Sequence, residues 1–440
     1  MEFQSVIFSG PGRHLHPIST TVPKPLLPIG NKPMIEYALK WCAQAAFASI
    51  TVAVDEQEYD AVNDFCLKTS DIKAKLVKIP HSTPSGAVLP LLHANGELNP
   101  HQDIVVVPCD FITDVDPESL ISTIRQQDDN IAVSGVYYRN TLETLETKTL
   151  EPDVLFHAVS DDGTELLVDA YERKAVSEAK VLKPRMAMLW RFPEVIATMD
   201  LMRSSIFFLK RHVLEFDDID FNKTFPKVIT DIARRTWRHR EMRERVSLLK
   251  LPPTTLFVRA NILSAYTEAN RYFLRLKARH AQSQPQEDRK REPNQAAIGN
   301  DSMVGANTVV GERSSVKRTA IGNNCTIGKK CRLNGCVILD NVTIDNEVML
   351  ENCIIGQGAV IESKSKLNGC SIEGKYVVVS ETEAKNEVLK GLSMAAMSDD
   401  EFSDVYSAST DESSSEGDME SDEDDSEEFD DDEDDIFDRS

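Results

Sequence analysis

SGPGRHLHPISTTVPKPLLPIGNKPMI, residues 9–35, joins a short apolar run to the start of an apolar-periodic helix. The apolar run, Phe3–Phe8, predicts a buried first strand. Gly10 and Gly12 then allow a turn that brings backbone N–H groups close to a ligand such as a phosphate. The prolines on both sides of Lys24 fix φ and stiffen the loop, so we expect the lysine to be held in place.

Strand and helix patterns alternate from this stretch to about Thr236. The alternation predicts an α/β fold: a Rossmann-like, parallel-type mixed sheet with helices on both faces. Ligands of such sheets bind at the carboxyl ends of the strands, where the glycine turn and Asp110 both fall. The predicted strands after the first are Ser49–Val54, Lys75–Pro80, Asp103–Pro108 and Asn130–Val136, with helices at Glu56–Lys68 and Pro117–Gln127.

A six-residue apolar repeat begins at Ile298 and continues, with occasional five-residue steps, to Ile372. Fourteen apolar positions stay in phase over this range. Hexapeptide repeats of this kind predict a parallel β-helix, in which each apolar side chain points into a triangular core.

Five of the eight cysteines lie in the repeat and invite a zinc interpretation. However, they occupy positions where other turns of the repeat carry serine or threonine, and none has the paired C-x₂-C spacing of a zinc site. We therefore predict that they are small core residues. They are Cys325, Cys331, Cys336, Cys353 and Cys370.

These patterns divide the chain into an α/β domain, residues 1–245, a connecting strand, helix and polar linker, 246–295, a β-helix, 296–380, and a tail, 381–440. A short helix is predicted at Thr382–Met397, and the rest of the tail is predicted to be disordered because it is acidic, serine-rich and poor in apolar residues.

The net charge of −23 comes almost entirely from that tail. From residue 399 to the end, 22 acidic residues face one basic residue, which leaves −2 for the rest of the chain. No basic patch supports direct nucleic-acid binding, and no apolar run is long enough to span a bilayer. The absence of a signal peptide and the eight cysteines lead us to expect reduced thiols in the cytosol.

Residues 9–35 resemble the signature of the sugar-phosphate nucleotidyltransferases, GGxGTRLxPLT followed by PKPLxPxxxKP. The second half matches closely through PKPLLP and the later Lys32-Pro33. The first half departs from the family: Ser9 replaces its first glycine, Arg13 its threonine, and His14 its catalytic arginine.

The nucleotidyltransferase resemblance also implies a set of nucleotide-site residues. Asp110 would be one of two magnesium ligands and Gly86 the glycine that packs on the base. The lysine and one aspartate are kept, whereas the arginine and the second aspartate are missing, so we expect a relic site without catalytic residues, cofactor or metal. The relic candidates are Gly10, Gly12, Lys24, Gly86 and Asp110.

Three further runs restrict the resemblance to one family. They are CDFITDV at residues 109–115, FVRAN at 257–261 and YTEANR at 266–271. They are similar to the gamma-subunit family of eukaryotic translation initiation factor 2B. That resemblance implies that the β-helix is left-handed and that the chain is a non-catalytic subunit of a guanine-nucleotide exchange factor. The chain ends in an acidic segment soon after the β-helix. This favours the gamma subunit over the epsilon subunit, whose extra helical domain carries the exchange activity.

The implied partners are the epsilon subunit directly, the alpha, beta and delta subunits in a decameric complex, and initiation factor 2 as substrate. A second hypothesis remains open: an active sugar-1-phosphate nucleotidyltransferase of the mannose-1-phosphate guanylyltransferase type. The absence of histidine from the repeat weakens a third, an acyltransferase with a histidine base.

Overall fold

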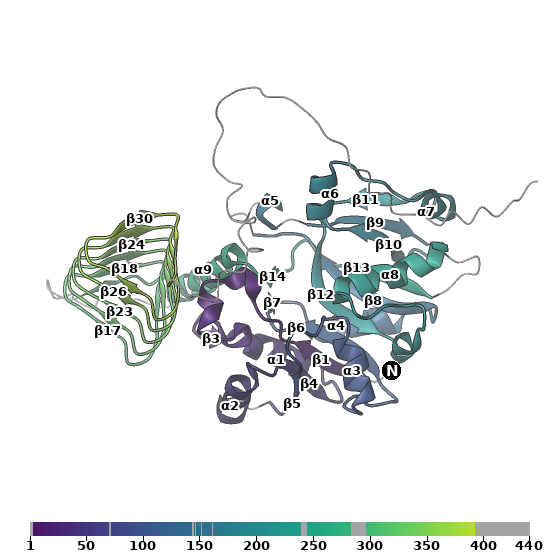
Figure 1. Ribbon diagram of the computed structural model, residues 1–440, viewed down its shortest axis with the longest axis horizontal. Coiled ribbons are helices and arrows are strands. Elements are labelled where there is room, and N and C mark those ends of the chain that lie inside the picture. The colour runs from purple at the N-terminus through teal and green to yellow at the C-terminus, as the bar shows by residue number, and fades with distance from the viewer. Residues whose placement is uncertain are drawn as a thin grey trace, which may run out of the picture. The chain divides into compact units, whose positions relative to one another are not determined.

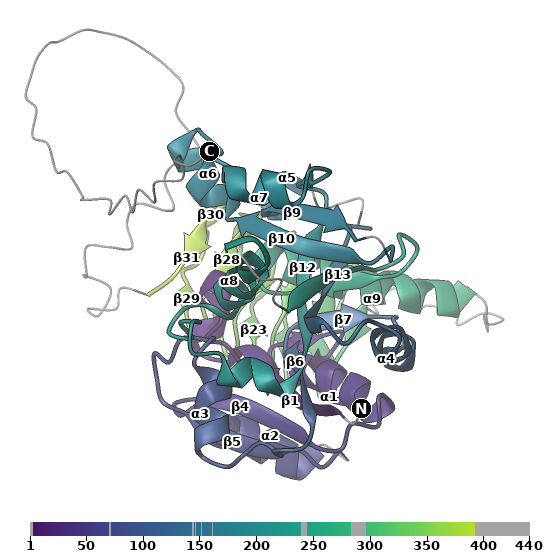
Figure 2. The same cartoon turned by 90° about the vertical axis from the view of Figure 1, so that its right-hand side faces the viewer.

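The computed structural model describes residues 3–391, except 70–71, 143–144, 146, 151, 161, 239–243 and 283–295. These residues form an α/β domain followed by a parallel β-helix (Figures 1 and 2). Among the helices in these ranges, none is long and apolar enough to cross a membrane.

A ten-stranded sheet forms the centre of the α/β domain, in the order β11-β9-β10-β13-β8-β12-β6-β1-β4-β5. The neighbours β6, β1, β4 and β5 run parallel, as do β13 and β8, whereas the other pairs are antiparallel. The prediction of a mixed sheet is therefore confirmed. The strands are β1 (Phe3–Phe8), β4 (Ile50–Asp55), β5 (Lys75–Ile79), β6 (Asp103–Pro108), β8 (Ile131–Tyr138), β9 (Val154–Val159), β10 (Glu165–Tyr171), β11 (Ile196–Thr198), β12 (Met202–Leu209) and β13 (Arg245–Lys250).

Helices cover both faces of this sheet because alternate residues of each strand point to opposite sides. In β1, Val6 packs with α3 (Val88–Ala94) and α8 (Phe225–Arg238). Its neighbour Ile7 packs on the other face. The helices on that face are α1 (Met34–Gln44), α2 (Tyr59–Thr69) and α4 (Pro117–Arg125).

The chain leaves the sheet later than the sequence led us to expect. β13 begins at residue 245, the expected end of the domain, and pairs with both β8 and β10. The next segment adds β14 (Phe257–Arg259), which pairs with β7 (Phe111–Thr113), and then α9 (Leu263–Gln282). The remainder of the predicted polar linker, from residue 283 to 295, lies outside the described residues.

The smaller elements lie around these. They are η1 (Arg13–Leu15), η2 (Ile18–Thr20), η3 (Lys24–Leu26), β2 (Pro28–Ile29), β3 (Lys32–Pro33), α5 (Thr147–Leu150), α6 (Arg173–Ala179), α7 (Met186–Arg191) and η4 (Arg211–Glu215).

The β-helix consists of short parallel strands stacked in three sheets. Its predicted register is confirmed, because eleven of the fourteen apolar positions, from Val316 to Ile372, form one buried core. Val304 and Val310 pack against that core from its first turn, whereas Ile298, at the start, is 39% exposed. The strands are β15 (Ala297–Ile298), β16 (Met303–Val304), β17 (Val309–Val310), β18 (Ser315–Lys317), β19 (Ala320–Ile321), β20 (Thr326–Ile327), β21 (Arg332–Asn334), β22 (Val337–Ile338), β23 (Thr343–Ile344), β24 (Met349–Glu351), β25 (Ile354–Ile355), β26 (Val360–Ile361), β27 (Lys366–Asn368), β28 (Ser371–Ile372) and β29 (Val377–Val378).

The short helix predicted at Thr382–Met397 is wrong in its described part. The chain instead adds two more strands to the β-helix, β30 (Glu383–Lys385) and β31 (Val388–Leu389). Ala384 and Leu389 continue the apolar register and pack against the core, and this packing outweighs the local helix preference of the segment. The predicted disordered tail beyond Gly391 lies outside the described residues.

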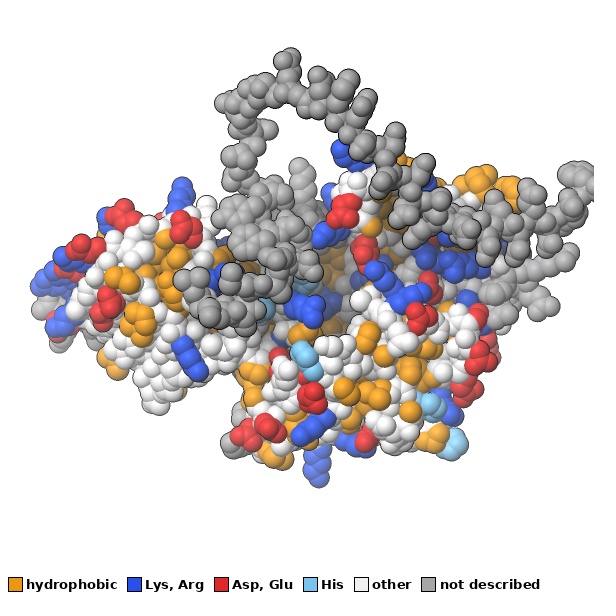
Figure 3. Space-filling view, in the orientation of Figure 1, with side chains coloured by type: hydrophobic (Ala, Val, Ile, Leu, Met, Phe, Trp, Pro, Cys, Tyr) orange, Lys and Arg blue, Asp and Glu red, His pale blue; other side chains and the backbone are white. Residues whose placement is uncertain are grey.

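One flat side of the β-helix packs against the α/β domain. Outward-facing Val337 and Ile354 are buried there, against the proline-rich loop and α9. Two hydrogen bonds support the contact: Asn31 Nδ2 donates to the Ile321 carbonyl at 2.9 Å, and Arg271 Nη2 of α9 donates to Asn352 Oδ1 at 3.0 Å. Other sides of the β-helix carry intermingled acidic and basic side chains (Figure 3).

Candidate functional site

The candidate site lies where β1 and β6 end side by side. The two strands are parallel and in register, with Phe8 opposite Pro108, so the glycine turn and Asp110 leave the sheet at the same edge. The sequence argument for their proximity is therefore correct for this edge.

Asp110 is the centre of a buried ion cluster. Its carboxylate is completely inaccessible to solvent and receives three charged hydrogen bonds. Lys24 Nζ lies 2.6 Å from Oδ2, while Arg259 donates from Nε to Oδ1 at 3.0 Å and from Nη2 to Oδ2 at 2.9 Å. The arginine fork thus binds both carboxylate oxygens, an arrangement among the strongest that side chains form.

Burial and charge act on the pKa of Asp110 in opposite directions. Burial by itself raises the pKa, but the charges and hydrogen bonds of Arg259 and Lys24 overcome that effect and hold the pKa below its ordinary value. The pKa of the Arg259 guanidinium is correspondingly raised, because the attraction of Asp110 exceeds the effect of burial. Asp110 and Arg259 therefore both stay ionised at neutral pH.

Local backbone geometry holds Lys24 on Asp110. The lysine begins the 3₁₀ turn η3, directly after Pro23. Gly12 has a φ of +68°, and a Cβ at this position would lie 2.9 Å from the Lys24 Cβ. Glycine is therefore required here both for its backbone conformation and for its size.

Arg259 was missed by sequence reasoning because it lies 149 positions from Asp110. β14 pairs with β7 so that Arg259 lies opposite Phe111, and the Ala260 N–H donates to the Asp110 carbonyl at 2.8 Å. Arg259 also donates to Ser205 Oγ at an irregularity in β12. The sequence did contain one signal for Arg259, an arginine within a short apolar strand. Arginine is rarely buried unless a carboxylate pairs with it.

Glu58 is a second acidic residue close to this cluster. One of its carboxylate oxygens is buried and has no hydrogen-bond partner. Burial, reinforced by the nearby charge of Asp55, raises the pKa of Glu58 to about 7, although Lys24 opposes the shift. Asp55 in turn accepts a 2.8 Å hydrogen bond from His81 Nδ1 in the tautomer that carries the proton there.

Gly10 and Gly86, the other two candidate glycines, do not contact the ion cluster. A Cβ at Gly10 would meet nothing within 4 Å. A Cβ at Gly86 would lie 2.4 Å from the Lys223 carbonyl oxygen and 2.7 Å from that of Phe221, so the face of this glycine is covered by the chain itself. Arg13 and His14 are exposed, and neither is a partner of Asp110.

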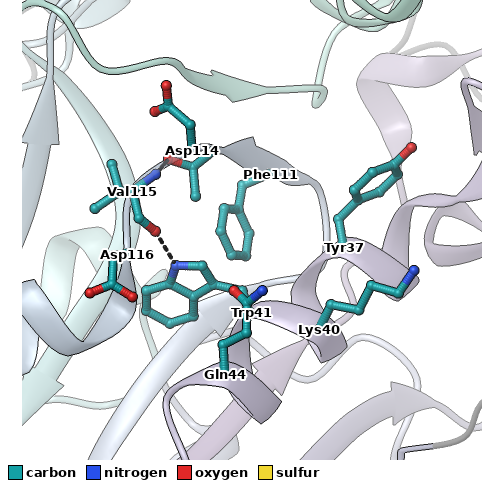
Figure 4. A pocket seen from close by; sticks show the side chains of 9 residues that line it. Tyr37, Lys40, Trp41, Gln44, Phe111, Asp114, Val115 and Asp116 are labelled. Atoms are coloured by element: carbon teal, nitrogen blue, oxygen red, sulfur yellow. Dashed lines mark hydrogen bonds between the residues drawn. The ribbon is translucent and has the colours of Figure 1, made fainter.

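A groove of about 560 Å³ lies outside this site, between α1 and residues 111–116 (Figure 4). Trp41 forms its wall, and the indole N–H donates to the Val115 carbonyl at 3.0 Å. None of the predicted site residues lines this groove. Within the described residues, no group of three or more His, Cys, Asp or Glu side chains is arranged to hold a metal ion.

Two family models match the chain. The nucleotidyl transferase model covers residues 5–144, and the model of the EIF2B subunit epsilon LbH domain covers residues 286–384. The second match supports a left-handed β-helix, as the sequence resemblance implied.

Among individual proteins, the chain is 26% identical over 224 residues to translation initiation factor eIF2B subunit gamma of Schizosaccharomyces pombe, covering 49% of this chain and 47% of that protein. It is 28% identical over 202 residues to mannose-1-phosphate guanyltransferase of Kluyveromyces lactis, covering 46% and 53%. The chain thus spans about half the length of these curated relatives. The resemblance to the gamma subunit that the motifs indicated is confirmed.

Proposed function

We propose that this chain is a non-catalytic, gamma-type subunit of translation initiation factor 2B, the guanine-nucleotide exchange factor that converts GDP-bound initiation factor 2 to its GTP-bound form. The sequence similarity to an eIF2B gamma subunit and the succession of the two matched domains support this assignment. The proposal implies a cytosolic protein that pairs with the epsilon subunit and joins the alpha, beta and delta subunits.

The single observation that carries the non-catalytic role is the buried ion cluster, in which Arg259 and Lys24 bind the carboxylate of Asp110. In a working nucleotidyltransferase the corresponding carboxylate would have to bind magnesium. Here both carboxylate oxygens are bound by Arg259 and Lys24, and the side chain has no exposed surface. A divalent cation would have to displace one cation and remain beside the other, so the residues present do not fit a magnesium site.

Two further features support a relic site. Residues 221–223 cover Gly86, where the resemblance implied a nucleotide base. Glu58 places a carboxylate near Lys24, where phosphates would have to approach. Both features oppose nucleotide binding, the first by excluding volume and the second by like-charge repulsion between phosphate and the ionised form of Glu58.

Purification of tagged full-length protein from cells tests the proposed assembly. We expect the four other subunits of the exchange factor to co-purify, and we expect the isolated complex to accelerate GDP release from initiation factor 2. Recovery of the chain without any of these subunits would contradict the proposal.

The alternative, an active mannose-1-phosphate guanylyltransferase, is favoured by the proximity of Gly12, Lys24 and Asp110 and by the similarity to a yeast enzyme of that name. Purified chain with magnesium, GTP and mannose-1-phosphate should release no pyrophosphate above background under our proposal. Turnover at rates of ordinary enzymes, about 1–1,000 per second, would establish the alternative instead.

A further inference from the structure

A second polar hollow, of about 430 Å³, lies on the α8 side of the central sheet, far along the chain from the glycine turn. It lies between the C-terminal half of α8 (labelled in Figure 2) and the segment that precedes this helix. We call it the arginine pocket. Its lining residues are Asp218, Ile219, Asp220, Lys223, Asp231, Arg234, Arg235 and Arg238.

Most charges of the arginine pocket are already paired. Arg234 Nε donates to Asp169 Oδ1 at 2.8 Å, and Lys223 Nζ donates to Asp231 Oδ2 at 2.9 Å. Asp220 lies 4.0 Å from the same lysine. These pairs hold the walls of the pocket in place and use Oδ1 of Asp169 and Oδ2 of Asp231 as acceptors.

Arg235 is the exception, because two of its guanidinium nitrogens, Nε and Nη1, are buried without a hydrogen-bond partner. The residue is only 7% exposed, and its guanidinium lies 3.7 Å from the centre of the Phe216 ring. Asp218 Oδ2 lies 3.2 Å from Nε and forms an ion pair with the guanidinium, yet neither Nε nor Nη1 has a hydrogen-bond partner. A buried guanidinium N–H without an acceptor is unfavourable, so this position favours a bound anion.

Arg238 extends the same face of α8, three residues further on. Among the described residues, no carboxylate forms an ion pair with it. Burial and the neighbouring charges of Arg234 and Arg185 lower the pKa of its guanidinium, which means that the positive charges here are crowded. An anion placed between Arg235 and Arg238 would relieve that repulsion.

We propose that the arginine pocket binds the phosphate group of a small phosphate monoester, with Arg235 and Arg238 as its principal ligands. Guanidinium groups present several N–H donors in one plane, which suits the oxygens of a phosphate dianion. A phosphate group fills only part of the pocket, whose volume lies in the range that holds whole small molecules. Asp220 and Ile219 line the space left for the rest of such a molecule.

Calorimetric titration of the full-length protein in chloride buffer tests the proposal, with phenyl phosphate and inorganic phosphate as probes and phenol as the control ligand. We expect saturable binding of phenyl phosphate, weaker binding of inorganic phosphate and none of phenol. Arg238→Gln changes an exposed residue and should weaken phenyl phosphate binding at least tenfold. Arg235→Lys keeps the charge but removes Nη1, and we expect a similar loss.

Lys40→Gln is the matched control, because Lys40 is an exposed cation on α1, which covers the opposite face of the sheet. It should bind phenyl phosphate as the unchanged protein does. Absence of saturable binding, or unchanged affinity in Arg238→Gln, would overturn the proposal. Equal affinity for the two phosphate probes would overturn its assignment to a monoester. If Arg235→Lys fails to fold, the comparison of Arg238→Gln with the unchanged protein still decides the proposal, because Arg238 is exposed.

Discussion

At the scale of single residues, the buried cluster of Asp110, Arg259 and Lys24 constrains the fold through charged contacts. A buried ion pair contributes little relative to apolar packing, but removing one partner leaves an uncompensated charge. Arg259→Met should therefore lower the free energy of unfolding by about 3–5 kcal/mol. Urea denaturation at pH 7 measures this loss.

Lys40→Met provides the control for that experiment. Lys40 forms an exposed pair with Glu36 one helical turn away, so its loss should cost less than about 0.5 kcal/mol. Equal losses for the two variants would mean that the buried cluster does not stabilise the fold. The double variant Asp110→Asn with Arg259→Met should lose less than the sum of the single changes, because the two side chains interact directly.

The acid dependence of stability follows from the lowered pKa of Asp110. A carboxylate with a lowered folded pKa contributes its full stabilisation above its unfolded pKa, about 3.9, and loses it as the pH falls towards the folded value. Asp110→Asn should therefore flatten the decline in stability below about pH 4. A variant whose stability declines as steeply as that of the unchanged protein would argue against this role.

Glu58 should have the opposite dependence on pH. Burial raises its folded pKa to about 7, so the native state holds the proton more tightly than the unfolded state does. Stability is then lost as the pH rises from about 4.3 to 7. Glu58→Gln should be more stable than the unchanged protein at pH 8, by about 1 kcal/mol after allowance for solvent screening, and equal to it near pH 4.

Denaturation of Glu58→Gln at both pH values checks this prediction. Glu178→Gln, at an exposed position of α6, serves as the control and should change stability at neither pH. A constant offset between Glu58→Gln and the unchanged protein at the two pH values would show that ionisation of Glu58 is not responsible.

Sequence reasoning at this scale succeeded where local pattern and topology coincide. Lys24 and Asp110 could be placed together because both follow parallel strands that are adjacent in the sheet. Arg259 could not, because its position depends on the pairing of β14 with β7, two short strands that carry no register signal of their own. The packing of residues 221–223 on Gly86 could not be predicted for a similar reason, because that segment lies far along the chain.

At the scale of elements, the β-helix was the most predictable part of the molecule. Every step of the chain in this fold repeats the same local environment, so the register can be read directly from apolar spacing. Where the prediction stopped short, at residue 380, the apolar signal had weakened to Ala384 and an isolated Leu389. The antiparallel pairs of the large sheet were less predictable, since strand order there is set by remote packing.

The cysteines of the β-helix provide a chemical test of its register. All five are buried in its core, as predicted, and Cys42 and Cys109 are buried in the α/β domain. Cys66, on α2, is the partly exposed member of the eight. Because reaction with iodoacetamide requires an accessible thiolate, the folded protein should be alkylated at Cys66 alone.

Mass spectrometry after alkylation counts the modified thiols. We expect one in the folded protein, none in folded Cys66→Ser, and all eight in urea. Modification of Cys336 or Cys353 in the folded protein would contradict the register, because these two lie at equivalent positions of successive turns and both face the core.

At the scale of the whole described molecule, the proline-rich loop serves two contacts at once. Lys24 points to Asp110, while Leu27 and Ile29 pack with α9 and with the outward face of the β-helix. The Tyr266 hydroxyl donates to the Pro28 carbonyl at 2.7 Å and fixes the loop between them. The two domains therefore share one set of residues, which domain boundaries drawn from composition could not reveal.

This shared contact accounts for the retention of the PKPLLP loop under the proposed non-catalytic role. A loop that only bound nucleotide would be free to change once that activity was lost. Here its residues hold a buried ion cluster on one side and the β-helix on the other. The same segment is thus required for stability independently of any ligand, because changes on either side disturb buried groups.

Contact between the two domains can be tested at Gly374, in the β-helix, which lies against Thr21 of the loop. A Cβ at Gly374 would lie 2.1 Å from Thr21 Oγ1 and 2.8 Å from its Cβ. Thr21 is short and stiff, so Gly374→Ala must force the domains apart at this point, at a cost of about 1–3 kcal/mol. Gly391→Ala, whose Cβ would have its nearest neighbour at 3.7 Å, is the matched control and should cost less than about 1 kcal/mol.

A double-mutant cycle separates this contact from effects within the β-helix. Thr21→Gly removes the three atoms nearest to the new methyl group, so it should restore much of the stability lost in Gly374→Ala. We expect a favourable interaction energy of about 1 kcal/mol or more between the two substitutions, measured from the urea unfolding of all four proteins. Strict additivity would show that the loss arises within the β-helix, and it would remove the basis for treating the loop as the joint between the two domains.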